Sequence, residues 1–394
     1  MMEVVDFING ILWHDSLTVL CLGVALILTI VLGCPQITHI KDMFKYLTKG
    51  KESDSGLSSF QTFAMALGGR VGTGNIAGVA TAIYFGGPGA VFWMWVYAVL
   101  GAATAFTEAA LAQTFKRTVN GEYRSGPPYY CEQLRIKGKK LVWFGAVFAV
   151  ADLIGLVVTG PTVQAFTIAD SMKVAFGIPP WISGAIQVIL FAIIMAGGMK
   201  RIGHFAARVV PFMAFAYILI AIILIIGNIG LVPAVVGSIF ASAFGGHAVF
   251  GGLIGSAIAW GIRRAVYSSE AGFGTGACAS GASEVSHPCK QGLAQALTVF
   301  IDTLGVCTAT AFIILMTGMY SVEGADGSIL YGAKAIIDSN IEAGTGYTQM
   351  AVSTMFGSGF GEAFIAIAVF FFAFTTNLAF GYYCKPETSY LIKN

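Results

Sequence analysis

The stretch GGRVGTGN, from Gly68 to Asn75, interrupts an apolar segment that runs from Gln61 to Phe85. Four of its eight residues are glycines, and each glycine weakens a helix by about 1 kcal/mol relative to alanine. Inside lipid an unpaired backbone amide or carbonyl costs several kcal/mol, so an opened helix must lie against protein or a water-filled cavity. Its freed amides can then bind an anion, and its freed carbonyls a cation. The stretch therefore predicts a ligand-binding break in a membrane helix, which is typical of transporters.

The composition indicates a protein of the lipid bilayer. Of the 394 residues, 56% are hydrophobic and 11% are charged, whereas about 25% of a soluble domain is charged. Repeated apolar runs of about 20 residues match a helix that crosses a membrane. Nucleic-acid binding has no support because the basic residues are scattered, and no obligatory protein partner is indicated. The seven cysteines lack the spacing of a metal site or disulfide framework. We predict an all-α, polytopic membrane protein.

The apolar runs predict nine spans, at about residues 16–33, 60–86, 89–115, 141–175, 181–198, 208–228, 247–276, 292–318 and 361–383. Most of the 22 lysines and arginines follow alternate spans, in loops 34–59, 116–140 and 199–208, after the seventh span and after the ninth. Loop 319–360, on the other side, is acidic. The positive-inside rule places the basic loops in the cytoplasm and the N-terminus outside the cell membrane. Loop 116–140 is expected to be a solvated connection.

A second polar, glycine-rich interruption, YSSEAGFG from Tyr267 to Gly274, lies in the seventh predicted span. The two interrupted spans enter the membrane from opposite sides, and such a pair marks the midplane binding site of a transporter built from inverted halves. We predict an extra span and linker over 1–59, a first repeat of five helices over 60–229 and a second repeat over 230–394. The second repeat has only three spans, so we expect two core helices to be missing from a shortened chain.

Several of these segments resemble one protein family. They are Gly68–Val96, VPFMAFAYIL at Val210–Leu219, AVYSSEAGFGTG at Ala265–Gly276 and FFAFTTNLAFGYY at Phe371–Tyr383. Together they are closely similar to the sodium:alanine symporter family, also called the alanine or glycine:cation symporters. The resemblance implies the LeuT-type fold, with two inverted five-helix repeats and two broken core helices, here with one extra N-terminal span. It also implies Na⁺-coupled symport of small neutral amino acids such as alanine and glycine.

The resemblance implies a Na⁺ site between the first break and the last predicted span. Its expected ligands are five uncharged oxygens, the carbonyls of Gly68, Val71 and Phe372 and the hydroxyls of Thr375 and Thr376. Hard oxygen donors of this kind suit a monovalent cation. The alternative for the two threonines is that their hydroxyls bond only to their own helix, as is common in membrane helices.

At the first break, the resemblance implies that the amides of Thr73 and Gly74 bind the substrate carboxylate, with Asn75 as a further donor or acceptor. The alternative is that the glycines only allow close helix packing. Gln164, in the fourth span, is expected either to line the pocket or to form a packing hydrogen bond. Arg70 is costly in lipid and must face a cavity or an acid. Its possible acidic partners are Glu108 and Asp302.

At the second break, the substrate ammonium is expected at the carbonyls, hydroxyls or carboxylate of Ser268, Ser269 and Glu270. An intramembrane carboxylate is a functional candidate by default. The alternative for Glu270 is a structural ion pair with Arg263 or Arg264. The aromatic residues Phe273 and Phe380 are predicted as further substrate contacts, with Phe380 as a lid or wall.

The sequence therefore favours Na⁺-coupled uptake of a small neutral amino acid by alternating access. A proton-coupled symporter that uses Glu270 or Glu108 is the alternative within transport. A membrane enzyme is not expected, because the five histidines lack the spacing of metal ligands or of a catalytic set. A channel is a third possibility, which saturable kinetics would exclude.

Overall fold

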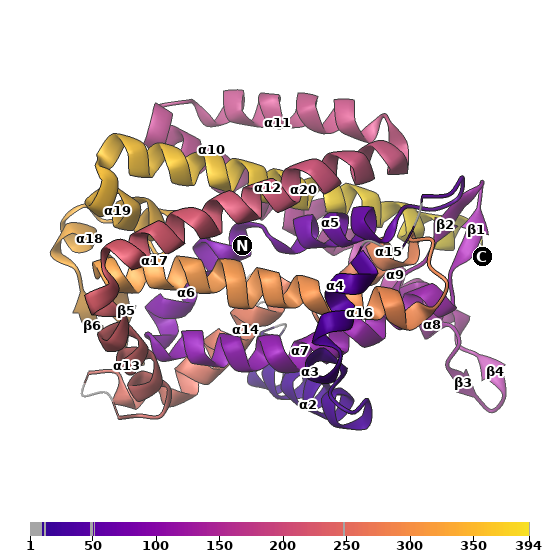
Figure 1. Cartoon of the computed structure of the whole chain (residues 1–394), viewed down its shortest axis with the longest axis horizontal. Coiled ribbons are helices and arrows are strands. Elements are labelled where there is room, and N and C mark those ends of the chain that lie inside the picture. Colours follow the sequence, from indigo (N-terminus) through magenta and orange to yellow (C-terminus); the bar gives the residue numbers. More distant parts are fainter. Residues whose placement is uncertain (1–9, 12, 48–49, 51, 247–248, 394) are drawn as a thin grey trace.

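The computed structural model describes residues 10–11, 13–47, 50, 52–246 and 249–393. Residues 247–248, where the seventh predicted span begins, and the first nine residues of the predicted 1–59 segment lie outside the described residues. Figure 1 shows the long helices side by side along one axis, with strands β1 to β4 at one end and β5, β6 and α18 at the other.

The first predicted break is confirmed. Helix α5 (Ser59–Arg70) ends at the break, a single 3-10 turn covers Thr73–Asn75, and α6 (Ala77–Gly86) continues the span. Helix α5 begins at a capping box, in which the Ser58 hydroxyl accepts from the Gln61 amide and the Gln61 side chain accepts from the Ser58 amide. The start of the helix is thus well specified, whereas its end is set by the glycines.

The second predicted break is also confirmed. Helix α14 (Ile254–Ser269) ends just before Glu270, and α15 (Thr275–Gly281) begins after the five residues 270–274. Three residues between the helices have left-handed backbone: Glu270 at φ 51°, Gly272 at φ 104° and Gly274 at φ 85°. An α-helix cannot continue through such residues, and only glycine adopts this region without cost.

The other predicted spans correspond to helices in the structure. These are α2 (Asp15–Val31), α7 (Gly89–Thr114), α9 (Val142–Ile154) with α10 (Gly160–Phe176), α11 (Pro180–Met195), and α16 (Pro288–Val299) with α17 (Thr308–Thr317). The pairs α9–α10 and α16–α17 are each joined by π-helical turns, at Gly155–Thr159 and Phe300–Cys307. Such turns occur frequently at functional sites in helices.

Several helices differ from the prediction. Helix α12 (Gly198–Gly227) begins before the predicted start at 208, α13 (Val232–Ala243) was not predicted, and α20 (Ser358–Lys393) continues past the predicted end at 383. The basic first turns of α12 extend the helix beyond its apolar part, and α13 is too short to be recognised as a span. Helix α20 continues because Glu387 is buried against the protein instead of marking a solvated end.

The loops predicted to be basic meet at one end of the molecule. The Leu57 amide donates to the Ala282 carbonyl at 2.8 Å, and Lys200 pairs with Glu52 at 3.7 Å. The short elements here are α3 (Pro35–Thr38), α4 (Ile40–Leu47), β1 (Arg117–Val119), β2 (Glu122–Arg124), α8 (Pro127–Cys131), β3 (Arg135–Ile136) and β4 (Lys139–Lys140). The prediction of a solvated 116–140 loop is wrong for residues 124–129, which are buried.

The opposite end carries β5 (Ser321–Glu323), β6 (Ile329–Gly332), α18 (Lys334–Asp338) and α19 (Thr345–Phe356). Among the described residues, five helical segments are long and apolar enough to cross a membrane: Gly89–Thr114, Val142–Phe176, Gly198–Gly227, Pro288–Thr317 and Ser358–Ile392. The chain is therefore a mostly helical, multi-pass membrane protein, as its composition predicted.

Candidate functional site

The two breaks lie in contact. A Cβ atom added to Gly74 of the first break would lie 3.2 Å from the Ser268 Cα and 3.2 Å from the Tyr267 ring of α14. The nearest atom to a Cβ at Gly78, one helical turn later, is at an ordinary 3.7 Å. Close packing, the alternative considered for these glycines, therefore applies at Gly74 and not at Gly78.

One buried carboxylate connects the two breaks. Asp302, in the π-helical turn before α17, accepts from the Asn75 side-chain amide at 2.6 Å and from the Ser268 hydroxyl at 3.0 Å. The neighbouring Thr303 hydroxyl also donates to it at 2.7 Å. Asp302 is fully buried. It was predicted as a partner of Arg70, but its hydrogen bonds hold the first and second breaks together.

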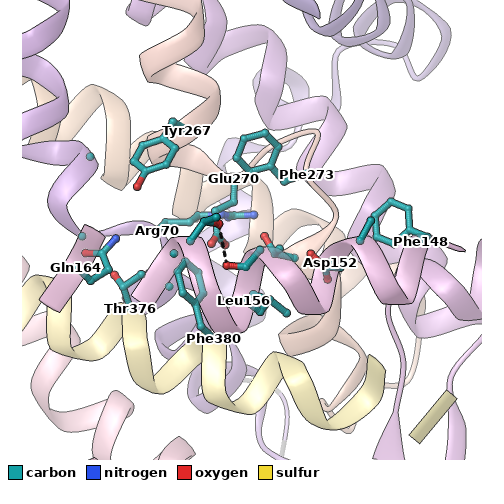
Figure 2. A pocket seen from close by; sticks show the side chains of 18 residues that line it. Arg70, Phe148, Asp152, Leu156, Gln164, Tyr267, Glu270, Phe273, Thr376 and Phe380 are labelled. Carbon is teal, nitrogen blue, oxygen red and sulfur yellow. Dashed lines mark hydrogen bonds between the residues drawn. The ribbon is translucent and has the colours of Figure 1, made fainter. Parts of the chain in front are cut away.

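A cavity of about 330 Å³ opens beside the breaks (Figure 2). Its walls come from both breaks, from α9 and α10 with their π-helical turn, and from α20. Five of the predicted substrate residues line it: Gly74, Gln164, Glu270, Phe273 and Phe380. The other four, Thr73, Asn75, Ser268 and Ser269, are buried behind this lining. Most of the wall is apolar, with a few polar groups, as in small-molecule sites generally.

Gln164 connects α10 to the first break. Its side-chain oxygen accepts from the Thr73 amide at 3.1 Å, while the Asn75 side-chain oxygen accepts from the Gly72 amide at 2.9 Å. Both outcomes expected for Gln164 are therefore present, since it lines the cavity and forms a buried hydrogen bond. The Thr73 N–H therefore points towards Gln164, which lines the cavity.

Glu270 does not form the ion pair with Arg263 or Arg264 that was its alternative role. Arg263 pairs with Asp15 at 2.7 Å, and Arg264 lies over the Trp260 ring at 5.1 Å, so that alternative is wrong. One carboxylate oxygen of Glu270 has no hydrogen-bond partner among the described residues, although the side chain is buried.

Arg70 also differs from its predicted pairing. Its guanidinium donates to the Gln295 carbonyl at 3.0 Å and forms no ion pair with Glu108 or Asp302 in the described part of the chain. Glu108 instead accepts from the Gly272 amide at 3.0 Å and so supports the second break. Arg70 does line the cavity, which was the other expectation for it.

All five oxygens of the predicted cation site converge. The Thr376 hydroxyl lies 3.0 Å from the Gly68 carbonyl oxygen, 3.5 Å from that of Val71 and 3.0 Å from that of Phe372. The Thr375 hydroxyl lies 3.4 Å from the Gly68 oxygen and 3.0 Å from the Phe372 oxygen. The hydroxyls therefore bond to their own helix and also reach the first break.

Two acidic residues at or near the cavity, Asp152 and Glu387, were not predicted. Asp152 of α9 lines the cavity, and Figure 2 shows it between Phe148 and the centre of the site. Glu387 of α20 lies within 4.8 Å of Asp152 and of the Cys278 sulfur. A carboxylate in the middle of an apolar span is a functional signal, which could have identified Asp152. Glu387 was missed because the helix was expected to end before it.

The model of the sodium:alanine symporter family matches residues 1–394. The chain is 50% identical to the putative sodium/proton-dependent alanine carrier protein YrbD of Bacillus subtilis (strain 168), over 100% of this chain and 79% of that protein. It is 38% identical to the probable sodium/glutamine symporter GlnT of the same organism, over 100% and 78%. It is 37% identical to the sodium/alanine symporter AgcS of Methanococcus maripaludis, over 99% and 83%. The chain therefore belongs to the sodium:alanine symporter family and is a transporter, not an enzyme.

Proposed function

We propose that the protein takes up a small neutral amino acid, alanine or glycine, together with Na⁺ as the coupling ion, by alternating access. One observation carries this proposal. The Thr376 hydroxyl belongs to the cluster of five oxygens, and Thr376 also lines the cavity. A cation in the cluster and a substrate in the cavity would therefore contact the same side chain, which gives a physical route for each to favour the binding of the other.

The oxygen cluster has the chemistry expected of a Na⁺ site. It consists of three carbonyls and two hydroxyls, hard donors without a full negative charge. Oxygens that bind a hard cation at about 2.4 Å in octahedral geometry lie about 3.4 Å apart. The separations between the Thr376 hydroxyl and its three carbonyl neighbours are 3.0 to 3.5 Å. A cation of this size could therefore bind here with little movement of the protein.

The cavity suits a small zwitterion. We expect a substrate carboxylate to take over the Thr73 N–H from Gln164, with Gly74 alongside, and the ammonium to meet the unpartnered oxygen of Glu270. Phe273 and Phe380 limit the room for the substrate side chain. The volume of about 330 Å³ is at the lower end of the range of about 300–1,000 Å³ for ligand sites, which favours a small amino acid.

The architecture that fits this proposal is the LeuT-type fold, with repeats over 60–229 and 230–394 and an extra span within 1–59. We place the end with the basic loops in the cytoplasm, and the N-terminus outside. One charge that crosses about 100 mV contributes about 2.3 kcal/mol. At about 1.4 kcal/mol per tenfold, this contribution alone supports roughly a 40-fold substrate gradient.

The test is uptake of labelled alanine and glycine into proteoliposomes that contain the full chain. We expect accumulation with an inward Na⁺ gradient and none with matched K⁺. The variant Thr375→Ala should reduce this accumulation at sub-saturating Na⁺, whereas Glu342→Gln, an exposed position at the end of the molecule that carries α18, should not. Accumulation without Na⁺, driven equally well by a pH gradient, would contradict Na⁺ coupling.

Proton coupling through Glu270 or Glu108 is the second candidate. Its support is that both carboxylates lie at the second break, Glu270 with an unpartnered oxygen and Glu108 as acceptor from Gly272. The relative YrbD is named as sodium/proton-dependent. In this case Glu270→Gln or Glu108→Gln would remove the response of uptake to a pH gradient, while the threonine variants would leave it unchanged.

A further inference from the structure

A second acidic group, of half-buried Asp152 and buried Glu387, lies beside the cavity at the end near α8. The carboxylate of Asp152 on α9, the sulfur of Cys278 on α15 and the carboxylate of Glu387 on α20 all lie within 4.8 Å of one another. Glu387 and Cys278 are almost completely buried, at 0% and 1% exposure. Asp152 also lines the cavity, so the group joins the cavity to the interior of the protein.

The hydrogen bonds of this group leave two acceptors unsatisfied. The Cys278 thiol donates to one oxygen of Glu387 at 3.3 Å. The other Glu387 oxygen and one oxygen of Asp152 are buried and have no partner among the described residues. Two adjacent carboxylates cannot both carry a charge cheaply at low dielectric, and an unpaired buried oxygen is itself costly. A cation or a proton between the two acids would remove both costs.

The neighbouring cations are engaged elsewhere. Arg117 pairs with Glu132, Arg124 pairs with Glu122, and Arg70 donates to Gln295. The titratable and charged groups on the elements packed around the two acids are Arg70, Arg117, Glu122, Arg124, Tyr129, Tyr130, Cys131, Glu132, Glu270, Tyr382, Tyr383, Cys384 and Lys385. In the described part of the chain, none of these basic residues forms an ion pair with Asp152 or Glu387.

The local geometry favours a proton over a metal ion. The Cys278 sulfur lies 3.3 Å from a Glu387 oxygen, which fits a hydrogen bond donated by a thiol, whereas a metal ligand must be a thiolate. The backbone of Gly126 also closes the group on the side of α8. A Cβ added there would lie 2.7 Å from the Cys278 sulfur and 3.1 Å from the near Glu387 oxygen.

We propose that Asp152 and Glu387 share one proton and form a proton-binding site that is loaded and released during the transport cycle. The three residues lie on three helices, and α15 begins at Thr275, which lines the cavity next to the second break. Movement of α15 away from α9 and α20 would separate Cys278 from Glu387 and admit water to the two acids. This link to the cycle rests on the proposed transport function, whereas the shared proton does not.

The shared proton is tested by infrared difference spectroscopy on purified full-length protein at pH 7. We expect the wild-type minus Glu387→Gln spectrum to contain the C=O stretch of a protonated carboxylic acid, and the wild-type minus Asp152→Asn spectrum to contain it too. Subtracting Glu342→Gln, an exposed acid, should give only carboxylate bands. Carboxylate bands alone in all three spectra, or Zn²⁺ retained by the wild type and lost in Cys278→Ser, would overturn the proposal.

The link to transport is tested in proteoliposomes that contain a pH-sensitive dye. Alanine uptake driven by a Na⁺ gradient should move protons in the wild type, and Glu387→Gln should keep the uptake but lose the proton movement. Uptake by the wild type with no proton movement, or unchanged proton movement in Glu387→Gln, would overturn this link. Absence of any alanine uptake would instead count against the proposed function, and the infrared result would still decide whether the proton is shared.

Discussion

At the level of single residues, the site depends on side chains that the two breaks share. Asp302 accepts hydrogen bonds from Asn75 and from Ser268, so one carboxylate fixes the distance between two segments far apart in the sequence. The sequence could identify Asn75 and Ser268 as unusual polar residues at membrane depth. It could not show that they face Asp302 and not the cavity, because that depends on the rotation of each half-helix about its own axis.

The contact between the breaks at Gly74 predicts a strong effect of one methyl group. In Gly74→Ala the new Cβ would lie 3.2 Å from the Ser268 backbone, which cannot move without shifting α14. We expect alanine uptake to fall by roughly tenfold or more, since small displacements of binding groups have large effects on rate. The measurement is the initial rate of uptake per folded protein, with folding checked by thermal unfolding in detergent.

Gly78→Ala is the matched control for this prediction. The nearest atom to its Cβ would be the Arg264 Cδ at 3.7 Å, an ordinary contact. Because alanine favours a helix by about 1 kcal/mol over glycine, this variant should keep its uptake and be at least as stable as the wild type. Equal rates in the two variants would show that the close approach at Gly74 has no functional role.

At the level of helices and loops, the sequence predicted apolar cores better than ends. The breaks in α5–α6 and α14–α15 were predictable because glycines and polar residues stand where a helix would otherwise continue. The end of α20 was not, because the span was expected to end at 383, and the burial of Glu387 beyond it involves Cys278 from another helix. Similarly, α13 was not predicted because its 12 residues are too few to span a bilayer, and its apolar residues are its only local signal.

The loops at the basic end supply a prediction that depends on pH. Glu284 accepts from the Tyr123 hydroxyl at 2.7 Å and from the Ser53 hydroxyl at 2.9 Å, which joins three loops. These hydrogen bonds, with that of Tyr123 the stronger, hold the pKa of Glu284 below its ordinary value of 4.5. A depressed pKa means that the ionised form stabilises the folded state, so this stabilisation is complete above pH 4.5 and is lost as the pH falls through the folded pKa.

The variant Glu284→Gln removes this charge and tests the prediction. At pH 7 its Tm should be lower than that of the wild type, by a few degrees at most because solvent screens the site. The difference between the two proteins should shrink as the pH falls below the ordinary pKa of the carboxyl. Thermal unfolding in detergent at a series of pH values measures this difference. A Tm gap that stays constant across the series would show that the ionised carboxylate contributes no stability.

At the level of the whole molecule, coupling requires that each ligand changes the affinity for the other by the same factor. Under the proposed function, two neighbouring threonines would separate ion binding from coupling. Both hydroxyls lie close to the Gly68 carbonyl oxygen, but Thr376 also lines the cavity and Thr375 does not. The family resemblance predicted both residues as ligands. Their different positions follow from the rotation of α20, which the sequence alone does not fix.

We therefore expect the two alanine substitutions to differ in kind. Each should weaken Na⁺ binding by roughly tenfold, since an oxygen that contacts a charged group contributes about 1.5–3 kcal/mol. In Thr375→Ala, saturating Na⁺ should still raise alanine affinity by the wild-type factor, because the contact shared with the cavity is intact. In Thr376→Ala this factor should fall towards one. The factor by which alanine raises the Na⁺ affinity should fall by the same amount, because coupling is reciprocal.

Equilibrium binding of alanine and of Na⁺, each measured with and without the other, gives all four affinities. If Thr376→Ser, which keeps the hydroxyl, loses the coupling as fully as Thr376→Ala, then shape at this position and not the shared oxygen carries the coupling.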